Sequence, residues 1–260
     1  MRARRTVLGA AVFANAKAKR LAIRLTKWTG KSPDYVHPKH LLPETDEQYW
    51  YLPHVAPRAR LLDVGCGNAM HTLKAAARCA VAVGIDRSEE SLRVGRRASA
   101  GPRPGTVALV RGDVETGLPF GDAGFDTVLC MDLLEHVHAR QAVLTEIRRV
   151  LRPGGALLLA VPNRATTWKR RLERAGLFHY SDPDHKVEYT FPELEAELDR
   201  GGFVVASRYP SVYDTPLVGL IDVVGGVSLA LYRRLSRLRR RLAARYPEED
   251  AGFYVVCRAR

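Results

Sequence analysis

The feature that most constrains this chain is the ten-residue run 60–69, RLLDVGCGNA. Its apolar residues, which flank the acid Asp63, predict a short buried strand. Gly65 and Gly67 then predict a sharp turn, because glycine tolerates backbone conformations that other residues avoid and leaves room for a ligand near the main chain. A strand that leads through such a turn into a helix is typical of nucleotide-type sites at the carboxyl edge of a parallel sheet.

Two kinds of nucleotide cofactor use a turn of this type, and the surrounding residues favour one of them. A dinucleotide site has the pattern G-x-G-x-x-G, but the third glycine position here is Met70. The carboxylate of Asp63 would repel a pyrophosphate and attract an amino-acid ammonium. We therefore favour S-adenosylmethionine, which carries an ammonium and a sulfonium. A tight turn without any ligand is the alternative.

Acids also follow the next two apolar runs. Asp86 is placed to accept hydrogen bonds from the two ribose hydroxyls of a nucleoside, although a plain turn before Ser88 as a helix N-cap would use the same residue. Further along, Asp113 can bind an adenine amino group while the backbone N–H of Val114 donates to the ring. These residues extend the expected cofactor site across the sheet edge.

Short apolar runs alternate with helical patterns through most of the chain, which predicts a doubly wound α/β domain. Residues 151–155, LRPGG, predict the end of a helix followed by a turn. The expected strands are 61–64, 81–85, 107–110, 125–131, 156–161, 203–206 and 252–258.

Five motifs occur in an order that resembles the class I S-adenosylmethionine-dependent methyltransferases. They are LLDVGCG, GIDRS, GDVE, FDTVLCMDLLEHV and LRPGGALLLAVPN, and the resemblance runs from about residue 45 to 212. It implies a Rossmann-like methyltransferase fold, in which a mostly parallel seven-stranded sheet ends in an antiparallel pair. It also implies S-adenosyl-L-methionine as cofactor.

Carried over residue by residue, the resemblance and the motifs give a set of cofactor-binding residues. One departure is Ala69, where many members of the family have glycine; alanine is small enough to be tolerated there. The predicted cofactor-binding residues are Asp63, Gly65, Cys66, Gly67, Asp86, Arg87, Asp113, Val114 and Met131.

The length of 260 residues allows one domain with appendages. We expect a basic N-terminal helical extension (1–44), a methyltransferase core (45–212), an apolar and Arg-rich insertion (213–250) and the final strand of the core (251–260). The insertion is expected to cover the substrate pocket or to lie on a membrane surface.

The cysteines predict a reducing compartment. Cys66, Cys79, Cys130 and Cys257 are far apart and form no C-x-x-C pair, so we expect small buried thiols. The basic start followed by apolar residues weakly imitates a signal peptide. We reject that interpretation because the expected cofactor is cytosolic, and we expect a cytoplasmic protein associated with the inner face of the membrane.

The positive charge is concentrated in two segments. The formal net charge is +13, yet residues 1–33 hold nine basic residues and residues 233–245 hold seven, with no acid in either segment. The remaining 25 basic residues are outnumbered by 28 acidic ones. Such asymmetry indicates an anionic partner, either a membrane surface bound through residues 1–33 and 216–245 or nucleic acid. A solvated basic face is the alternative.

The spacing within both segments predicts amphipathic helices. Basic residues recur from Lys17 to Lys27 at three- and four-residue steps beside Leu21 and Trp28, and leucines alternate with arginines from residue 231 to 245. Helices of this kind can lie in a membrane interface.

The acceptor chemistry depends on the end of the fourth strand. If a helix starts there, Asp132, Glu135 and His136 share one face, and His185 follows later in the motif DPDHKVEYT. These four residues could bind Mg²⁺ or another divalent metal. His136 and His185 are also the candidate catalytic residues, one to orient a hydroxyl acceptor and the other to take its proton.

Two branches of the family resemble this pattern: the ubiquinone-biosynthesis O-methyltransferases and the small-RNA 3′-terminal 2′-O-methyltransferases. Both have E-x-x-E-H, whereas this chain has Asp132 at the first position. In other small-molecule methyltransferases the histidine lines the pocket without a metal, so that interpretation stays open.

Three functions follow from these patterns. We favour O-methylation of a small-molecule or lipid-linked acceptor by in-line methyl transfer. An RNA ribose 2′-O-methyltransferase is the second, and nucleic acid is the less favoured partner because stacking aromatics beside basic residues are sparse. A non-catalytic protein that binds S-adenosylmethionine is the third. The acceptor itself is not encoded in a readable motif.

Overall fold

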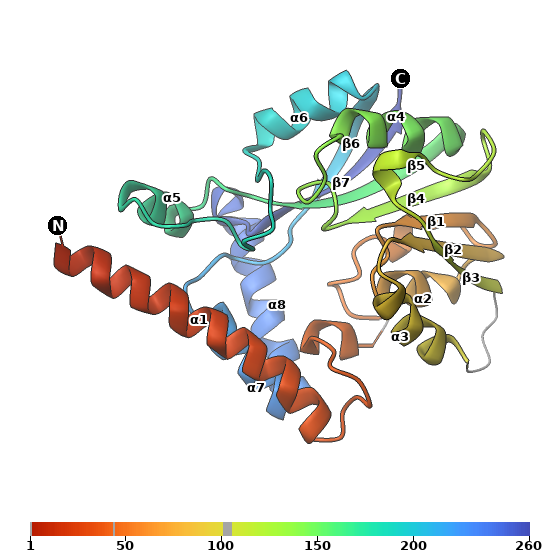
Figure 1. The fold of residues 1–260 in the computed structure, drawn as a ribbon. Coiled ribbons are helices and arrows are strands. Elements are labelled where there is room, and N and C mark those ends of the chain that lie inside the picture. The colour runs from red at the N-terminus through yellow and green to blue at the C-terminus, as the bar shows by residue number, and fades with distance from the viewer. Residues whose placement is uncertain (1, 44, 101–105) are drawn as a thin grey trace. The chain divides into compact units, whose positions relative to one another are not determined.

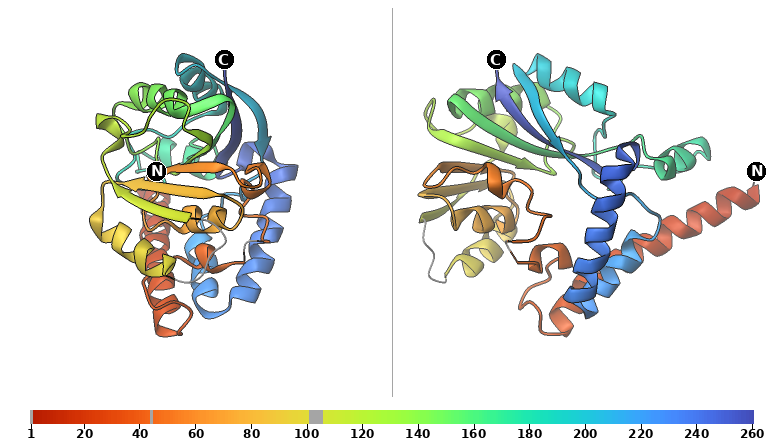
Figure 2. Two further views of the ribbon diagram at one scale, coloured as in Figure 1. Left: turned by 90° about the vertical axis from the view of Figure 1, so that its right-hand side faces the viewer. Right: turned by 180° about the vertical axis from the view of Figure 1, so that it is seen from behind.

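The computed structural model describes residues 2–43, 45–100 and 106–260, and the chain forms two compact units (Figures 1 and 2). The first, here called the sheet unit, comprises Tyr49–Pro162, Asp182–Tyr209 and Phe253–Arg260. The second, here called the helical unit, comprises Met1–Gln48, Asn163–Ser181 and Pro210–Gly252.

The sheet has seven strands in the order β3-β2-β1-β4-β5-β7-β6. β1 to β5 are parallel where they pair, and β6 and β7 are antiparallel. This confirms the predicted doubly wound, mostly parallel sheet with one antiparallel pair. The strands are β1 Arg60–Val64, β2 Val81–Asp86, β3 Thr106–Arg111, β4 Phe125–Met131, β5 Leu151–Pro162, β6 Phe203–Tyr209 and β7 Gly252–Ala259.

The strand order reverses between β1 and β4, and this topological switch determines where a ligand can bind. β1 lies between β2 and β4, so that Asp63 is in register with Gly84 on one side and Leu129 on the other. The connections after these strands therefore meet at one carboxyl edge of the sheet.

Helices pack on the sheet according to their position in the chain. α2 Met70–Ala76 and α3 Glu89–Ser99 contact β1 to β3, whereas α4 Arg140–Val150 contacts β5 and α6 Phe191–Arg200 contacts β6. Buried aliphatic side chains fill the core, with Leu62 and Ile147 fully buried in it. The four cysteines are buried and free, as predicted.

One local expectation is wrong. Residues 151–155 are expected to end a helix and then to turn. The helix α4 does end at Val150, but β5 begins directly at Leu151, which pairs with Phe125. The register shifts beyond that pair, and Gly154 has φ of 76°. The glycine-rich segment is therefore accommodated as an irregularity within a longer strand.

The helical unit contains the two basic segments, and both are helical. Its main helices are α1 Arg2–Trp28, α5 Thr167–Arg174, α7 Val218–Val227 and α8 Leu229–Arg245. Asp46 fixes α8 within this unit, because it accepts hydrogen bonds from Arg233 and Arg240, each at 2.8 Å. Among the helices of the described residues, none combines the length and apolarity needed to cross a bilayer.

Candidate cofactor and active site

The turn after β1 has the backbone that its glycines predict. Gly65 and Gly67 have φ of 71° and 53°, in the left-handed region that favours glycine. The N–H of Gly67 donates to a carboxylate oxygen of Asp86 at 2.8 Å. A Cβ at Gly65 would lie 2.6 Å from the side chain of Leu133, whereas a Cβ at Gly67 would meet nothing within 4 Å. Gly65 is therefore required by both backbone and packing, and Gly67 by backbone alone.

Ala69 also adopts a left-handed conformation, with φ of 60°. Its size fits, as expected, but the Cβ makes this conformation unfavourable by about 1 kcal/mol. The buried methyl group faces Gly95 of α3, where an added Cβ would lie 2.9 Å from that of Ala69. The alanine thus imposes backbone strain on the turn while packing closely on α3.

Asp63 is buried behind the turn. Its Oδ2 accepts a hydrogen bond from the Oγ1 of Thr72 on α2 at 2.6 Å. Burial raises the pKa of Asp63 to about 7, the Thr72 hydrogen bonds oppose that rise, and the charge of Asp86 adds to it. The carboxylate would become easier to ionise if a cationic group lay close by.

A cavity of about 470 Å³ opens at the carboxyl edge of the sheet unit. Two backbone N–H groups fix Asp86 in its wall, since its Oδ1 accepts from Ser88 and its Oδ2 from Gly67, each at 2.8 Å. The predicted site residues that line the cavity are Gly65, Asp86, Arg87, Asp113, Val114, Asp132 and His136.

Other predicted residues lie close by but outside the lining. Cys66 and Met131 are buried at the ends of β1 and β4, and burial raises the pKa of the Cys66 thiol, so the thiol stays protonated. The remaining predicted residues outside the lining are Asp63, Gly67, Glu135 and His185.

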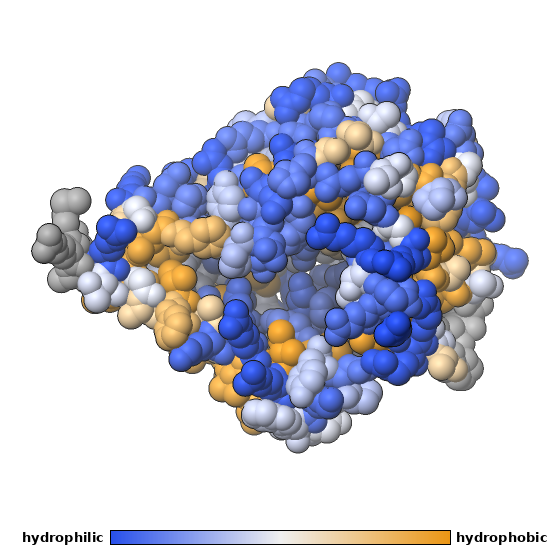
Figure 3. Space-filling view, in the orientation of Figure 1, coloured by the Kyte–Doolittle hydropathy of each residue, from blue (hydrophilic) through white to orange (hydrophobic). Residues whose placement is uncertain are grey.

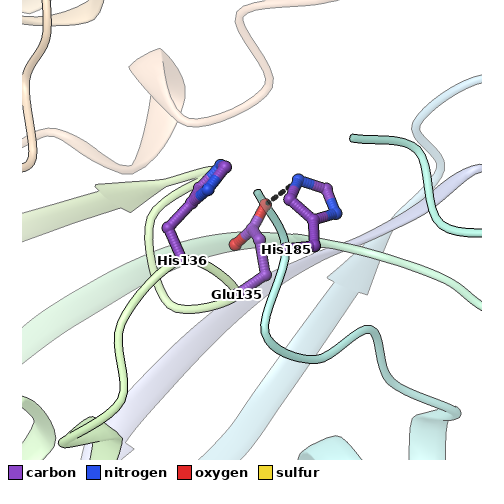
Figure 4. A group of neighbouring side chains, drawn as sticks. All are labelled: Glu135, His136 and His185. Atoms are coloured by element: carbon purple, nitrogen blue, oxygen red, sulfur yellow. Dashed lines mark ion pairs between the residues drawn. The ribbon is translucent and has the colours of Figure 1, made fainter. Parts of the chain in front are cut away.

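Beside the cavity, Glu135, His136 and His185 lie close together (Figure 4). One ligand atom from each residue lies within 4.8 Å of the others. The rings of His136 and His185 are 4.6 Å apart between centroids, and Nε2 of His185 is 4.0 Å from Oε1 of Glu135. Burial, together with the charge of His185, lowers the pKa of His136. His136 is therefore largely neutral at neutral pH.

Asp132 is not part of this group, and the helix expected to unite it with Glu135 and His136 is wrong. Residues 132–137 form turns, and α4 begins only at Arg140. Asp132 has φ of 52° and is exposed in the cavity wall. The left-handed residue redirects the chain immediately after β4, so the i, i+3, i+4 spacing of a helix does not apply.

The donor set of Glu135, His136 and His185 fits a divalent ion. One carboxylate and two imidazoles suit Mn²⁺, Fe²⁺ or Zn²⁺ better than Mg²⁺, which prefers oxygen ligands. Nδ1 of His185 lies 2.7 Å from Oε1 of Glu188, the arrangement that orients a metal-binding histidine. Glu135 and Glu188 are both buried, so a cation beside them would compensate their charge.

Several residues of the site were missed from the sequence. Glu188, three residues after His185 in the motif DHKVE, carries a spacing signal that could have been used. Lys186 and His138 line the cavity, and Leu133 packs against Gly65, but no periodicity distinguishes them. Their positions depend on irregular turns that the sequence pattern does not specify.

Comparisons with known proteins identify relatives of this chain. A family model described as a methyltransferase domain matches residues 62–159. A ubiquinone biosynthesis O-methyltransferase from Xanthomonas campestris pv. campestris is 30% identical over 165 residues, which cover 60% of this chain and 68% of that protein. A demethylmenaquinone methyltransferase from Symbiobacterium thermophilum is 36% identical over 131 residues, or 49% of this chain and 51% of that protein.

Solved structures share the fold at lower identity. A S-adenosylmethionine-dependent methyltransferase from Methanosarcina mazei has a TM-score of 0.55 at 19% identity and covers 80% of this chain and 96% of its own. The [4+2]-cyclase SpnF has a TM-score of 0.57 at 20% identity and covers 82% of this chain and 81% of its own. Since one of these proteins is described as a cyclase, the fold alone does not define the reaction.

The sheet and its cavity define a Rossmann-like, doubly wound fold with a cavity at the topological switch. With the matching relatives, they place the chain in a family: it belongs to the class I S-adenosylmethionine-dependent methyltransferases. The chain spans about half the length of the first curated relatives that it matches, from 43% to 51%.

Proposed function

We propose that this protein transfers a methyl group from S-adenosylmethionine to an oxygen atom of a small-molecule or lipid-linked acceptor. One observation carries the proposal: His136 lies both in the wall of the cofactor cavity and in the group with Glu135 and His185. A proton-accepting or metal-binding residue is thus next to the space where a methyl donor would lie.

The cavity wall and the turn behind it would together supply a partner for each part of the cofactor. Asp86 would accept hydrogen bonds from the ribose hydroxyls, while Asp113 and the N–H of Val114 would bind the adenine. The glycine turn would bring the backbone close to the methionine portion, and the buried charge of Asp63 would favour its ammonium. Arg87 also lines the cavity, next to Asp86.

Methyl transfer is an in-line displacement, so the protein mainly has to align the acceptor and exclude water. A hydroxyl acceptor also has to lose its proton, and the lowered pKa of His136 leaves an imidazole free to take it. A divalent ion held by Glu135, His136 and His185 would instead make the acceptor hydroxyl more acidic. His185 would orient the acceptor in either case.

The names of the relatives support a quinone-like, lipid-linked acceptor, because they include ubiquinone biosynthesis O-methyltransferases and a demethylmenaquinone methyltransferase. We also retain the predicted membrane-surface partner and cytoplasmic location in this proposal. An RNA ribose is less well supported, since five acids line the cavity: Asp86, Asp113, Glu115, Asp132 and Asp184. Only Arg87 and Lys186 oppose them among the lysine and arginine residues of that lining.

Calorimetry with S-adenosylmethionine and its demethylated product tests the cofactor site. We expect both to bind, and Asp86→Asn to weaken binding by about tenfold through loss of charged hydrogen bonds. A methyl-transfer screen of quinols, polar lipids and small RNAs with labelled cofactor then tests the acceptor class. Lack of binding by the folded protein would refute the proposal, and methylation of RNA alone would favour the second function.

A further inference from the structure

Large apolar side chains are exposed along the pair formed by α1 and α7 in the helical unit. On α1, Leu21 is 42% and Trp28 is 65% exposed. On α7, Leu220 is 59% and Val227 is 61% exposed. Single exposed apolar residues are common, but a contiguous group indicates an interaction surface.

The two helices pack closely and run in the same direction. Gly219 contacts Asn15, and its N–H donates to the side-chain oxygen of that residue at 2.6 Å. Seven residues later, Gly226 contacts Ala22, and its carbonyl accepts from Thr29 at 3.1 Å. A Cβ at Gly219 would lie 2.5 Å from the carbonyl oxygen of Asn15. The glycines thus fix which side of each helix faces the other.

The exposed side chains lie on one side of this pair. With 3.6 residues per turn, Leu21 and Trp28 point about 20° apart, roughly a quarter turn from the residues of α1 that contact α7. Leu220 and Val227 are also about 20° apart and roughly a quarter turn from the contact glycines. The rotation from the contact residues to the exposed residues has opposite directions in the two helices. In a pair of parallel helices, this places all four exposed side chains on the same side of the pair.

Cations border this apolar strip, and neither of the two helices exposes an acid beside them. α1 contains no acidic residue, and the one acid in α7, Asp222, is buried with its Oδ2 3.2 Å from Nε2 of His37. In Figure 3, hydrophilic and apolar residues lie next to one another along α1 at the lower left. By the same helical spacing, Lys17 and Arg24 of α1 point about 20–60° from Leu21 and Trp28, and the cations Arg20 and Lys27 lie about 80–120° away on the same side.

We propose that this face docks on an anionic lipid surface. The strip formed by Leu21, Trp28, Leu220 and Val227, here called the docking face, enters the boundary between headgroups and acyl chains. The cations beside it contact the lipid phosphates, and the charge complementarity selects an anionic bilayer over a neutral one. The inference goes beyond the proposed methyl transfer and does not depend on it.

Sedimentation of the full chain with phosphatidylcholine vesicles, with and without phosphatidylglycerol, tests the docking face. We expect about tenfold stronger binding to the anionic vesicles. Leu220→Ser with Val227→Ser should weaken that binding about tenfold by removing apolar area. Arg20→Gln with Arg24→Gln should do the same by removing charge.

Matched controls distinguish the docking face from general surface effects. Val204→Ser on β6 removes an apolar side chain that is 46% exposed outside the helical unit, and Arg78→Gln with Arg93→Gln removes two exposed charges in the sheet unit. Both controls should bind vesicles like the wild type. Circular dichroism reports whether each variant is folded.

A measurement on the wild type keeps the test independent of folding in the variants. Brominated lipids should quench the fluorescence of Trp28, and Trp28→Phe should remove the quenched signal. Absence of quenching, equal binding to both kinds of vesicle, or full binding by the folded face variants would overturn the proposal. Salt-sensitive RNA binding or self-association through this face, without vesicle binding, would overturn it in favour of another partner.

Discussion

Nδ1 of His185 lies 2.7 Å from Oε1 of Glu188, while Nε2 of the same ring lies 4.0 Å from Oε1 of Glu135. Because an ionised carboxylate accepts hydrogen bonds and cannot donate them, Glu188 holds the ring proton on Nδ1. In the neutral ring, Nε2 is then the atom without a proton, and it lies on the side of Glu135 and the neighbouring His136. Glu188 is therefore a positioning residue that determines what His185 can offer to a metal or an acceptor.

Replacing Glu188 by glutamine should weaken metal binding without removing any ligand. The amide no longer enforces the Nδ1 tautomer, and loss of such a partner typically costs 10- to 100-fold in metal affinity. Calorimetric titration of metal-stripped protein with Mn²⁺ measures the change, and ¹⁵N chemical shifts of His185 report its tautomer. Unchanged affinity and an unchanged tautomer in Glu188→Gln would contradict this role.

The metal set itself is tested by two histidine variants. His185→Ala should abolish stoichiometric Mn²⁺ binding, because two remaining donors are too few for a tight site. His138→Ala is the matched control, since His138 lines the cavity but lies outside the group of three. Electron paramagnetic resonance of bound Mn²⁺ measures both. Equal binding by both variants would place the ion elsewhere, and no binding by the wild type would leave His136 as a metal-free base.

Gly65 and Gly67 provide a matched pair within the cofactor turn. Gly65→Ala should destabilise the protein by about 1–3 kcal/mol, because the new Cβ overlaps Leu133 and φ is positive. Gly67→Ala should cost only about 1 kcal/mol, since it meets no neighbour and suffers backbone strain alone. Urea denaturation measures both free energies of unfolding.

A double variant separates packing from backbone strain at Gly65. The double variant Gly65→Ala with Leu133→Ala should lose less free energy of unfolding than the sum of the two single changes, because the smaller side chain at residue 133 relieves the steric overlap. Strictly additive effects would show that Leu133 does not restrict this position. The affinity for S-adenosylmethionine, measured by calorimetry, should rank the variants in the same order as their free energies of unfolding, so that Gly65→Ala binds most weakly.

The sequence was sufficient for the regular parts of this fold. Short apolar runs predicted the strands, and the acids Asp86 and Asp113 lie at the cavity because parallel strands share one carboxyl edge. The turn after β4 could not be predicted in this way. The left-handed Asp132 breaks the assumed helix, so spacing wrongly grouped it with His136.

Contacts between residues that are far apart in the sequence could not be predicted from local patterns either. His185 lies beside Glu135 because the backbone N–H of Lys186 donates to the carbonyl of Glu135 at 2.7 Å. No local propensity encodes that bridge between two irregular segments. The motif suggested the residues, but the tertiary hydrogen bond positions them.

Asp63 should give the protein a measurable pH dependence. Its pKa is raised from the ordinary 3.8 to about 7, so between these values the folded state holds a proton that the unfolded state has lost. The free energy of unfolding therefore falls as pH rises through this window, by as much as about 1.4 kcal/mol per pH unit from this group. Asp63→Asn should remove this contribution, which denaturation of both proteins at pH 5 and 7.5 would reveal as a difference in slope.

The same proton links pH to cofactor binding. If the ammonium of S-adenosylmethionine is stabilised by ionised Asp63, binding has to displace the proton below pH 7, so wild-type affinity should rise by up to about tenfold per pH unit toward neutrality. Asp63→Asn should bind more weakly at pH 8 and show a flat profile. Because Asp86 faces the cavity and also interacts with Asp63, Asp86→Asn serves as the control: it should weaken binding but keep the slope. Equal slopes in wild type and Asp63→Asn would mean that the buried acid supports the turn through Thr72 and does not respond to the methyl donor.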